Sequence, residues 1–141
     1  MKKKLKSRKI SYFCFILLLS IISSCNEETI LPDNASINFT KSLHDFGELP
    51  LKKEASIVFE FNNNGKELLQ ITDVKTTCGC AAPEWSKETI KPSKTGKIKI
   101  TYDSQHPGRF NKTITVYYNG KNSPLELKIK GRVAYPEDTL E

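Results

Sequence analysis

The sequence predicts an all-β fold, a two-sheet sandwich of about seven strands. Apolar and polar residues alternate with a period of two in several short segments. Asparagine, glycine and proline separate these segments and supply turn residues. We find no internal repeat and no helical run of convincing length. Two stacked sheets allow each strand to bury one apolar face while its other face meets water.

Six segments carry the alternation. Their apolar members are Ala35, Ile37 and Phe39; Ile57, Phe59 and Phe61; Leu69, Ile71 and Val74; Ile98, Ile100 and Tyr102; Ile114, Val116 and Tyr118; Leu125, Leu127 and Ile129. We expect Phe59, Ile71, Ile100 and Val116 to be buried. The spacing breaks near Thr72-Asp73, which indicates a bulge. The run Asn62-Asn63-Asn64-Gly65 tolerates positive φ and predicts a tight turn.

The first 24 residues have the composition of a lipoprotein signal peptide. Met1 to Lys9 carries six basic residues and no acidic one, and Ile10 to Ile22 is an apolar run too short to span a bilayer comfortably. The alternative is a membrane anchor that stays on the chain. Ile22-Ser23-Ser24-Cys25 resembles the bacterial lipobox, whose cysteine is acylated on sulfur before cleavage. The resemblance implies a mature protein that begins at lipidated Cys25 and is attached to a membrane.

The rest of the chain predicts one domain. Residues 25–35 are polar and contain Pro32, so we expect a tether between lipid and domain. Residues 36–135 contain the alternating segments, and residues 136–141 form a short tail. This length is enough for one small domain with one core.

The positive net charge of the chain comes from the predicted signal peptide. The whole chain has 22 basic and 16 acidic residues. Six of the basic residues and none of the acidic ones lie in residues 1–24, so residues 25–141 hold 16 of each. Nucleic-acid binding therefore has no support in the composition, and we expect no nucleic-acid partner.

The segment Cys78-Gly79-Cys80 is the feature most capable of chemistry. With Cys14 removed and Cys25 lipidated, Cys78 and Cys80 are the only thiols expected in the folded domain. In a regular strand, both sulfur atoms would point to one face as small apolar plugs. A disulfide requires a bend, which Gly79 allows, because bridged Cα atoms lie within about 6.8 Å of each other.

Three roles stay open for Cys78 and Cys80. They are buried or locally bridged thiols without chemistry, which we favour, a redox pair, or ligands of Cu(I) or Zn(II). A structural staple is the poorest explanation, because a ring this small removes little chain entropy. A metal would need further ligands from His44, His106 or a partner. Both histidines lie in turn-like segments and are expected at the surface, so we predict no metal site.

The sequence contains no motif of a known catalytic centre. HExxH, GxSxG, CxxC and glycine-rich phosphate loops are all absent from it. We therefore expect no enzyme activity and no cofactor.

Five segments together resemble the domain of unknown function 1573 (DUF1573) family. They are Phe46 to Leu49, Phe59 to Ile71, Thr76 to Trp85, Ile90 to Asp103 and Gly108 to Asn119. The similarity runs from about Ile37 to Val133, and Cys-Gly-Cys followed by a proline and a tryptophan is its most diagnostic part. The resemblance implies secreted, often lipid-anchored proteins, common in Bacteroidota, with an immunoglobulin-like domain of the Hydin and major-sperm-protein type. It implies no reaction.

Two residues within these segments carry separate expectations. Ser93 follows Pro92 where the family usually has Pro-Gly, and a serine is compatible with a type I turn. Trp85 could anchor a ligand at the surface, but a lone tryptophan in a small sandwich belongs more often to the core.

These observations predict a lipid-anchored, non-catalytic binding module of the cell envelope. We expect it at the outer membrane, facing the periplasm or the cell surface. Its partner is a membrane through the lipid, and an envelope protein or glycan through sheet edges or loops. The alternative is a periplasmic thiol-redox or metal-binding protein that acts through Cys78 and Cys80.

Overall fold

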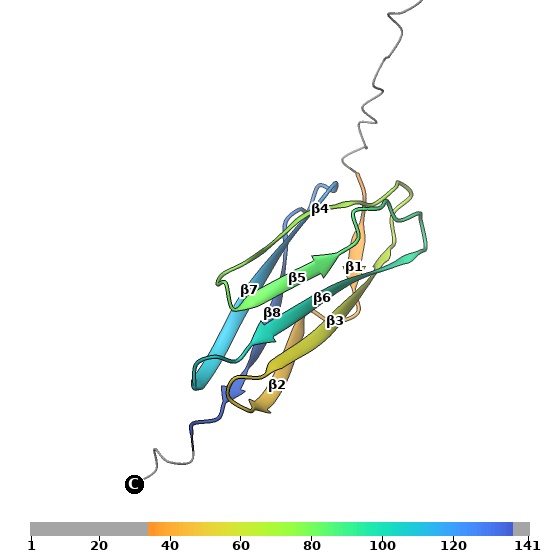
Figure 1. The fold of residues 1–141 in the computed structure, drawn as a ribbon. Coiled ribbons are helices and arrows are strands. Elements are labelled where there is room, and N and C mark those ends of the chain that lie inside the picture. Colours follow the sequence, from red (N-terminus) through yellow and green to blue (C-terminus); the bar gives the residue numbers. More distant parts are fainter. Residues whose placement is uncertain (1–33, 137–141) are drawn as a thin grey trace, which may run out of the picture. The chain divides into compact units, whose positions relative to one another are not determined.

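A computed structural model describes residues 34–136, which form two four-stranded β-sheets packed face to face (Figure 1). The strands are β1 (Ile37–Phe39), β2 (Leu43–Leu49), β3 (Glu54–Asn63), β4 (Ile71–Thr76), β5 (Ala81–Trp85), β6 (Thr95–Asp103), β7 (Gly108–Tyr118) and β8 (Leu125–Val133). Sheet A has the order β1-β3-β6-β5, and sheet B has the order β2-β8-β7-β4. The predicted two-sheet sandwich is confirmed, with eight strands in the described residues.

The first four strands alternate between the sheets, whereas β5 and β6 both belong to sheet A and β7 and β8 both belong to sheet B. All neighbouring strands are antiparallel except β2, which runs parallel to β8 at one edge of sheet B. In Figure 1, β1 leads in at one end of the sandwich and β8 leaves at the opposite end. The edge strands are β1 and β5 in sheet A, and β2 and β4 in sheet B.

The core lies between the two sheets. Its fully buried members on sheet A include Phe59, Phe61, Ile98 and Ile100, and those on sheet B include Ile114, Val116, Leu127, Ile129 and Val133. The four residues that we expected to be buried are so, with exposed fractions of 2% or less. Burial of each such side chain contributes about 1.5–3 kcal/mol, so the alternating pattern supplies most of the drive to form the sandwich.

Two strands, β2 and β5, were not predicted, because neither alternates cleanly. In β2 the register shifts between Asp45 and Glu48, and Gly47 has a φ of 66°. Strand β5 is short and contains Pro83. The bulge predicted near Thr72-Asp73 is confirmed, since the register of β4 shifts between Ile71 and Asp73.

The tight turn predicted from the asparagine run is wrong. Asn63 is the last residue of β3 and is fully buried, and no residue of the run has a positive φ. The Asn63 side-chain amide donates to the carbonyl oxygens of Glu67 and Ile90, both at 2.8 Å. Its oxygen accepts a hydrogen bond from the Gly65 amide at 3.0 Å. A buried side chain therefore organises this connection.

The type I turn suggested for Pro92-Ser93 is also wrong. Ser93 has a φ of 62°, and the Lys94 amide donates to the Lys91 carbonyl at 3.1 Å. Proline fixes φ near about −65° at the first central position, so a positive φ at the second defines a type II turn. Ser93 occupies the left-handed conformation that glycine adopts more readily.

The predicted signal peptide, Cys25 and most of the predicted tether and tail lie outside the described residues. Within residues 34–136 no helix is long and apolar enough to cross a membrane.

Candidate functional site

The Cys78-Gly79-Cys80 segment forms the turn that carries the chain from sheet B to sheet A. Strand β4 ends at Thr76 and strand β5 begins at Ala81. The two cysteines therefore do not continue a regular strand, so the condition under which both sulfur atoms would share one strand face is not met. The chain bends at Gly79, where a Cβ atom would meet no other atom within 4 Å.

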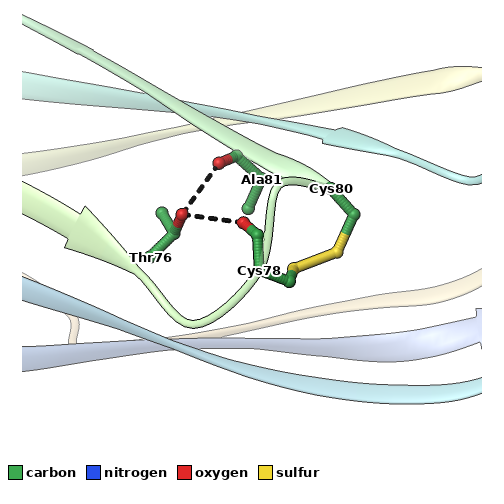
Figure 2. The surroundings of a disulfide bond; sticks show 4 residues. All are labelled: Thr76, Cys78, Cys80 and Ala81. Atoms are coloured by element: carbon green, nitrogen blue, oxygen red, sulfur yellow. Dashed lines mark hydrogen bonds between the residues drawn. A yellow bond between two sulfur atoms is a disulfide. The ribbon is translucent and has the colours of Figure 1, made fainter.

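A disulfide joins Cys78 to Cys80 across this bend (Figure 2). The Cα atoms lie 5.3 Å apart, within the usual range for bridged cysteines. Both cysteines are half-buried and pack against the core. The disulfide closes the short loop covalently. A redox role for the two cysteines stays a prediction.

Hydrogen bonds hold the backbone around the disulfide. The Thr76 hydroxyl lies 2.9 Å from the Cys78 carbonyl oxygen and 3.1 Å from that of Ala81 (Figure 2). The Cys80 carbonyl accepts from the Asp103 amide at 2.9 Å, which ties the turn to β6. The turn is thus fixed to both sheets. In the bridged state its sulfur atoms are not thiolates, the form that attacks disulfides and binds metals.

The two histidines do not complete a metal site with these cysteines. His44 lies in strand β2, half-buried, with its ring edge-to-face on Phe46 at 4.5 Å, so the turn predicted for it is wrong. Burial, and then the nearby Lys41, lower the pKa of His44. His106 is exposed between β6 and β7, as expected. Within residues 34–136 no three His, Cys, Asp or Glu side chains lie together as metal ligands.

Trp85, at the end of edge strand β5, packs against the core as expected but remains half-exposed. Its indole Nε1 is buried without a hydrogen-bond partner in the described part of the chain. The Lys87 ammonium lies 3.8 Å from the ring centroid, in cation–π contact. The exposed face of the ring is therefore partly covered by this lysine.

The outer face of sheet A carries two lysine–glutamate pairs across neighbouring strands. Lys97 lies opposite Glu60 with an N–O distance of 3.2 Å, and Lys99 contacts Glu84 at 3.0 Å. The hydroxyls of Ser56 and Thr101 are hydrogen-bonded at 3.0 Å between them. Such exposed pairs stabilise a fold only slightly. Farther along this face two acidic residues, Glu54 and Asp103, are register partners.

The outer face of sheet B places arginine opposite arginine, so its like-charge pair is basic. Arg109 of β7 and Arg132 of β8 are register partners. Nearby, Lys130 forms an ion pair with Asp45 at 3.4 Å. The pKa of Asp45 is lowered, first because its carboxylate accepts a hydrogen bond from the Gly47 amide and also because of Lys130.

A hollow of about 450 Å³ opens at this place, and we call it the sheet B hollow. It is lined by Asp45, Gly47, Arg109, Phe110, Asn111, Lys130, Gly131 and Arg132. Sequence reasoning missed it, because the β7–β8 register and the parallel β2 strand bring its residues together. The only signal in the sequence is that Gly108-Arg109 and Gly131-Arg132 repeat a Gly-Arg pair.

None of the four edge strands offers a long, regular edge to a partner strand. Strand β1 has three residues, and β5 contains Pro83, which has no amide hydrogen. Strands β4 and β2 each contain a register shift. Short edges, prolines and bulges are the usual protections against strand addition.

This architecture defines an immunoglobulin-like sandwich of the PapD type. The family described as "Protein of unknown function (DUF1573)" matches residues 37–133. The chain belongs to this family, and the resemblance found in the sequence is confirmed. No curated protein matches the chain.

Several solved structures share the fold at low sequence identity. A protein of unknown function from Porphyromonas gingivalis W83 is 18% identical with a TM-score of 0.64, over 76% of this chain and 51% of that one. This chain thus spans about half the length of that protein. The seventh PapD-like (ASH) domain of human CEP192 is 11% identical with a TM-score of 0.63, over 82% and 97% of the two chains.

A domain of this kind also occurs within a larger enzyme. The secreted serine protease VesC from Vibrio cholerae is 12% identical with a TM-score of 0.52, over 76% of this chain but 25% of the protease. At these identities the likenesses show the fold alone.

Proposed function

We propose that this chain is a lipid-anchored, non-catalytic interaction module of the bacterial cell envelope, whose outer face of sheet B meets the partner. One observation carries the proposal: Arg109 and Arg132 lie opposite each other and make no ion pair with any residue that the structure describes. Like charges placed opposite each other destabilise a sheet, so an isolated domain gains nothing from them. An anionic partner would remove that cost.

The edges of the sheets support the choice of a face. Strand addition requires a run of free backbone amides and carbonyls along a regular edge. Each edge strand is either very short, interrupted by a proline or shifted in register. The sequence led us to expect a partner at sheet edges or loops. We instead place the partner on the outer face of sheet B.

The anchor is the second half of the proposal. Its support is the basic and apolar N-terminus followed by Ile22-Ser23-Ser24-Cys25. Lipid chains contribute about 0.8 kcal/mol per buried CH₂, so a cysteine with more than one acyl chain binds a membrane durably. We place the protein at the outer membrane.

A cross-linking experiment tests the interaction face. A photoreactive residue replaces Asn111 on the outer face of sheet B in one variant and Ser56 on the outer face of sheet A in the other, and both are expressed in the native envelope. We expect a reproducible cross-linked species from position 111 and none from position 56. Equal cross-linking from both positions contradicts the proposed face.

A fractionation experiment tests the anchor. Cys25→Ala should move the protein from the membrane to the soluble envelope fraction or leave the precursor uncleaved. Cys14→Ala, within the same predicted signal peptide, is the matched control and should change neither location nor mass. An unchanged location and mass for Cys25→Ala contradicts lipidation.

A further inference from the structure

The sheet B hollow has the charge of a site for a small anion. Arg109, Lys130 and Arg132 contribute three positive charges, and Asp45 contributes one negative charge. The net charge of the lining is therefore +2. Asp45 is already engaged by Lys130 and by the Gly47 amide, so its carboxylate does not neutralise the two arginines.

The sheet places the two arginine residues side by side. As register partners on neighbouring antiparallel strands, Arg109 and Arg132 have Cβ atoms about 4.5–5.5 Å apart. Glu48 is the register neighbour of Arg132 on β2, yet no ion pair joins them. The pair thus lacks a counterion among the residues that the structure describes.

Two glycines line the hollow, one beside open space and one packed against an aromatic ring. A Cβ atom on Gly47 would meet nothing within 4 Å, so its side of the hollow is open space. At Gly131, a Cβ atom would lie 2.7 Å from the Phe110 ring and 2.9 Å from the Gly47 carbonyl. The buried Phe110 ring thus closes the floor, and a ligand would rest at the surface among the polar side chains.

We propose that the sheet B hollow binds a phosphate monoester group. Arginine presents a planar fork of donors that matches phosphate oxygens, and two arginines and a lysine line this hollow. A phosphate monoester carries nearly two negative charges at neutral pH, which balances the net charge of the lining. Three cations around one carboxylate do not form the long basic stripe that tracks a nucleic-acid backbone.

This inference names a ligand class for the interaction module proposed above and rests on that proposal for its biological setting. The binding itself is independent of any partner protein and is measured on the full chain in a detergent with an uncharged headgroup. Inorganic phosphate is the first probe, and acetate at equal ionic strength is the control anion. We expect phosphate, and not acetate, to shift the backbone amide NMR signals of residues 109–111 and 130–132 in a saturable manner.

Substitutions of charged residues distinguish phosphate binding in the hollow from general electrostatic attraction to the protein. Arg109→Gln and Arg132→Gln should each weaken phosphate binding about tenfold, as expected for loss of one charge-assisted pair. Lys128→Gln removes a charge from the same strand and face but outside the hollow lining, and Lys97→Gln removes one from sheet A. Both controls should bind phosphate within about twofold of the parent, because neither side chain lines the hollow and exposed charges are partly screened by salt.

Two further probes identify the source of the phosphate. Glucose 1-phosphate represents a phosphorylated saccharide, and phosphatidylcholine vesicles with phosphatidic acid represent a lipid headgroup. Binding of either that depends on Arg109 and Arg132 supports the proposal and names the source. The phosphate proposal is overturned if Lys128→Gln weakens phosphate binding as much as the arginine variants do, or if acetate shifts the NMR signals as much as phosphate does. Cross-linking of a partner from position 111 would support the interaction face in either case.

Discussion

The two sheets of this sandwich are alike on the inside and different on the outside. Toward the core, each presents a row of fully buried apolar side chains, such as Phe59 and Ile100 on sheet A and Ile114 and Ile129 on sheet B. Toward solvent, sheet A pairs Lys97 with Glu60 and sets Glu54 opposite Asp103, whereas sheet B sets Arg109 opposite Arg132. The inner faces are therefore equivalent, whereas the outer faces differ in the sign of the like charges that they place opposite each other.

Truncation of a core side chain on either inner face is the change that we expect to lower the free energy of unfolding most. We expect Phe59→Ala under sheet A to lower the free energy of unfolding by about 3–5 kcal/mol, and Ile129→Ala under sheet B by about 2–5 kcal/mol. Both residues are fully buried, so each change leaves a cavity. Urea unfolding measures the losses. If one variant loses less than 1 kcal/mol (about a fivefold change in the folding equilibrium), the two inner faces are not equivalent.

The packing beneath the sheet B hollow can be disturbed through Gly131. A methyl group there would contact the Phe110 ring and the Gly47 backbone at less than 3.0 Å, so Gly131→Ala should cost about 1–3 kcal/mol. Gly79→Ala is the matched control, because a Cβ atom on Gly79 meets nothing within 4 Å. Thermal unfolding should separate the two variants clearly. Equal melting temperatures would show that the Phe110 ring can move aside freely.

The sequence predicted the inner faces far better than the outer ones. Six alternating segments identify the core strands, because a period of two with one buried face is visible in any single strand. The sheet B hollow depends instead on which strands become neighbours and in which register. The parallel pairing of β2 with β8 brings Asp45 beside Lys130, although 85 positions separate them in the chain. No local pattern encodes that pairing.

The same limit explains the errors at the connections. Asparagine is common in turns, but Asn63 is fully buried and its side-chain amide donates hydrogen bonds to the carbonyl oxygens of Glu67 and Ile90. The Cys78-Gly79-Cys80 segment continues the spacing of β4 in the sequence, whereas the chain leaves sheet B at Thr76. In both places tertiary contacts outweigh local preference.

A smaller effect concerns the turn that leads into β6 of sheet A. Ser93 has a φ of 62°, a conformation that costs a residue with a side chain about 1–2 kcal/mol relative to its preferred one. Ser93→Gly should therefore raise the free energy of unfolding by about 0.5–1 kcal/mol after the greater freedom of unfolded glycine is subtracted. Lys94→Gly, one residue later and without a positive φ, should lower it instead. Stabilisation by both changes would contradict the assigned turn.

The smallest expected effect tests the difference between the outer faces directly. At low ionic strength Lys97→Gln breaks the pair with Glu60 on sheet A and should lower the free energy of unfolding by about 0.2–0.5 kcal/mol. On sheet B, Arg132→Gln removes a like-charge neighbour of Arg109 and should raise it by a similar amount, about 0.2–0.5 kcal/mol. Both changes remove one positive charge, so the net charge of the protein cannot explain opposite signs. High salt should shrink both effects, because exposed charges are screened within about 3 Å at 1 M. If Arg132→Gln instead destabilises the domain as Lys97→Gln does, Arg132 makes a stabilising contact within the fold. The charge argument for an external anion in the sheet B hollow would then fail.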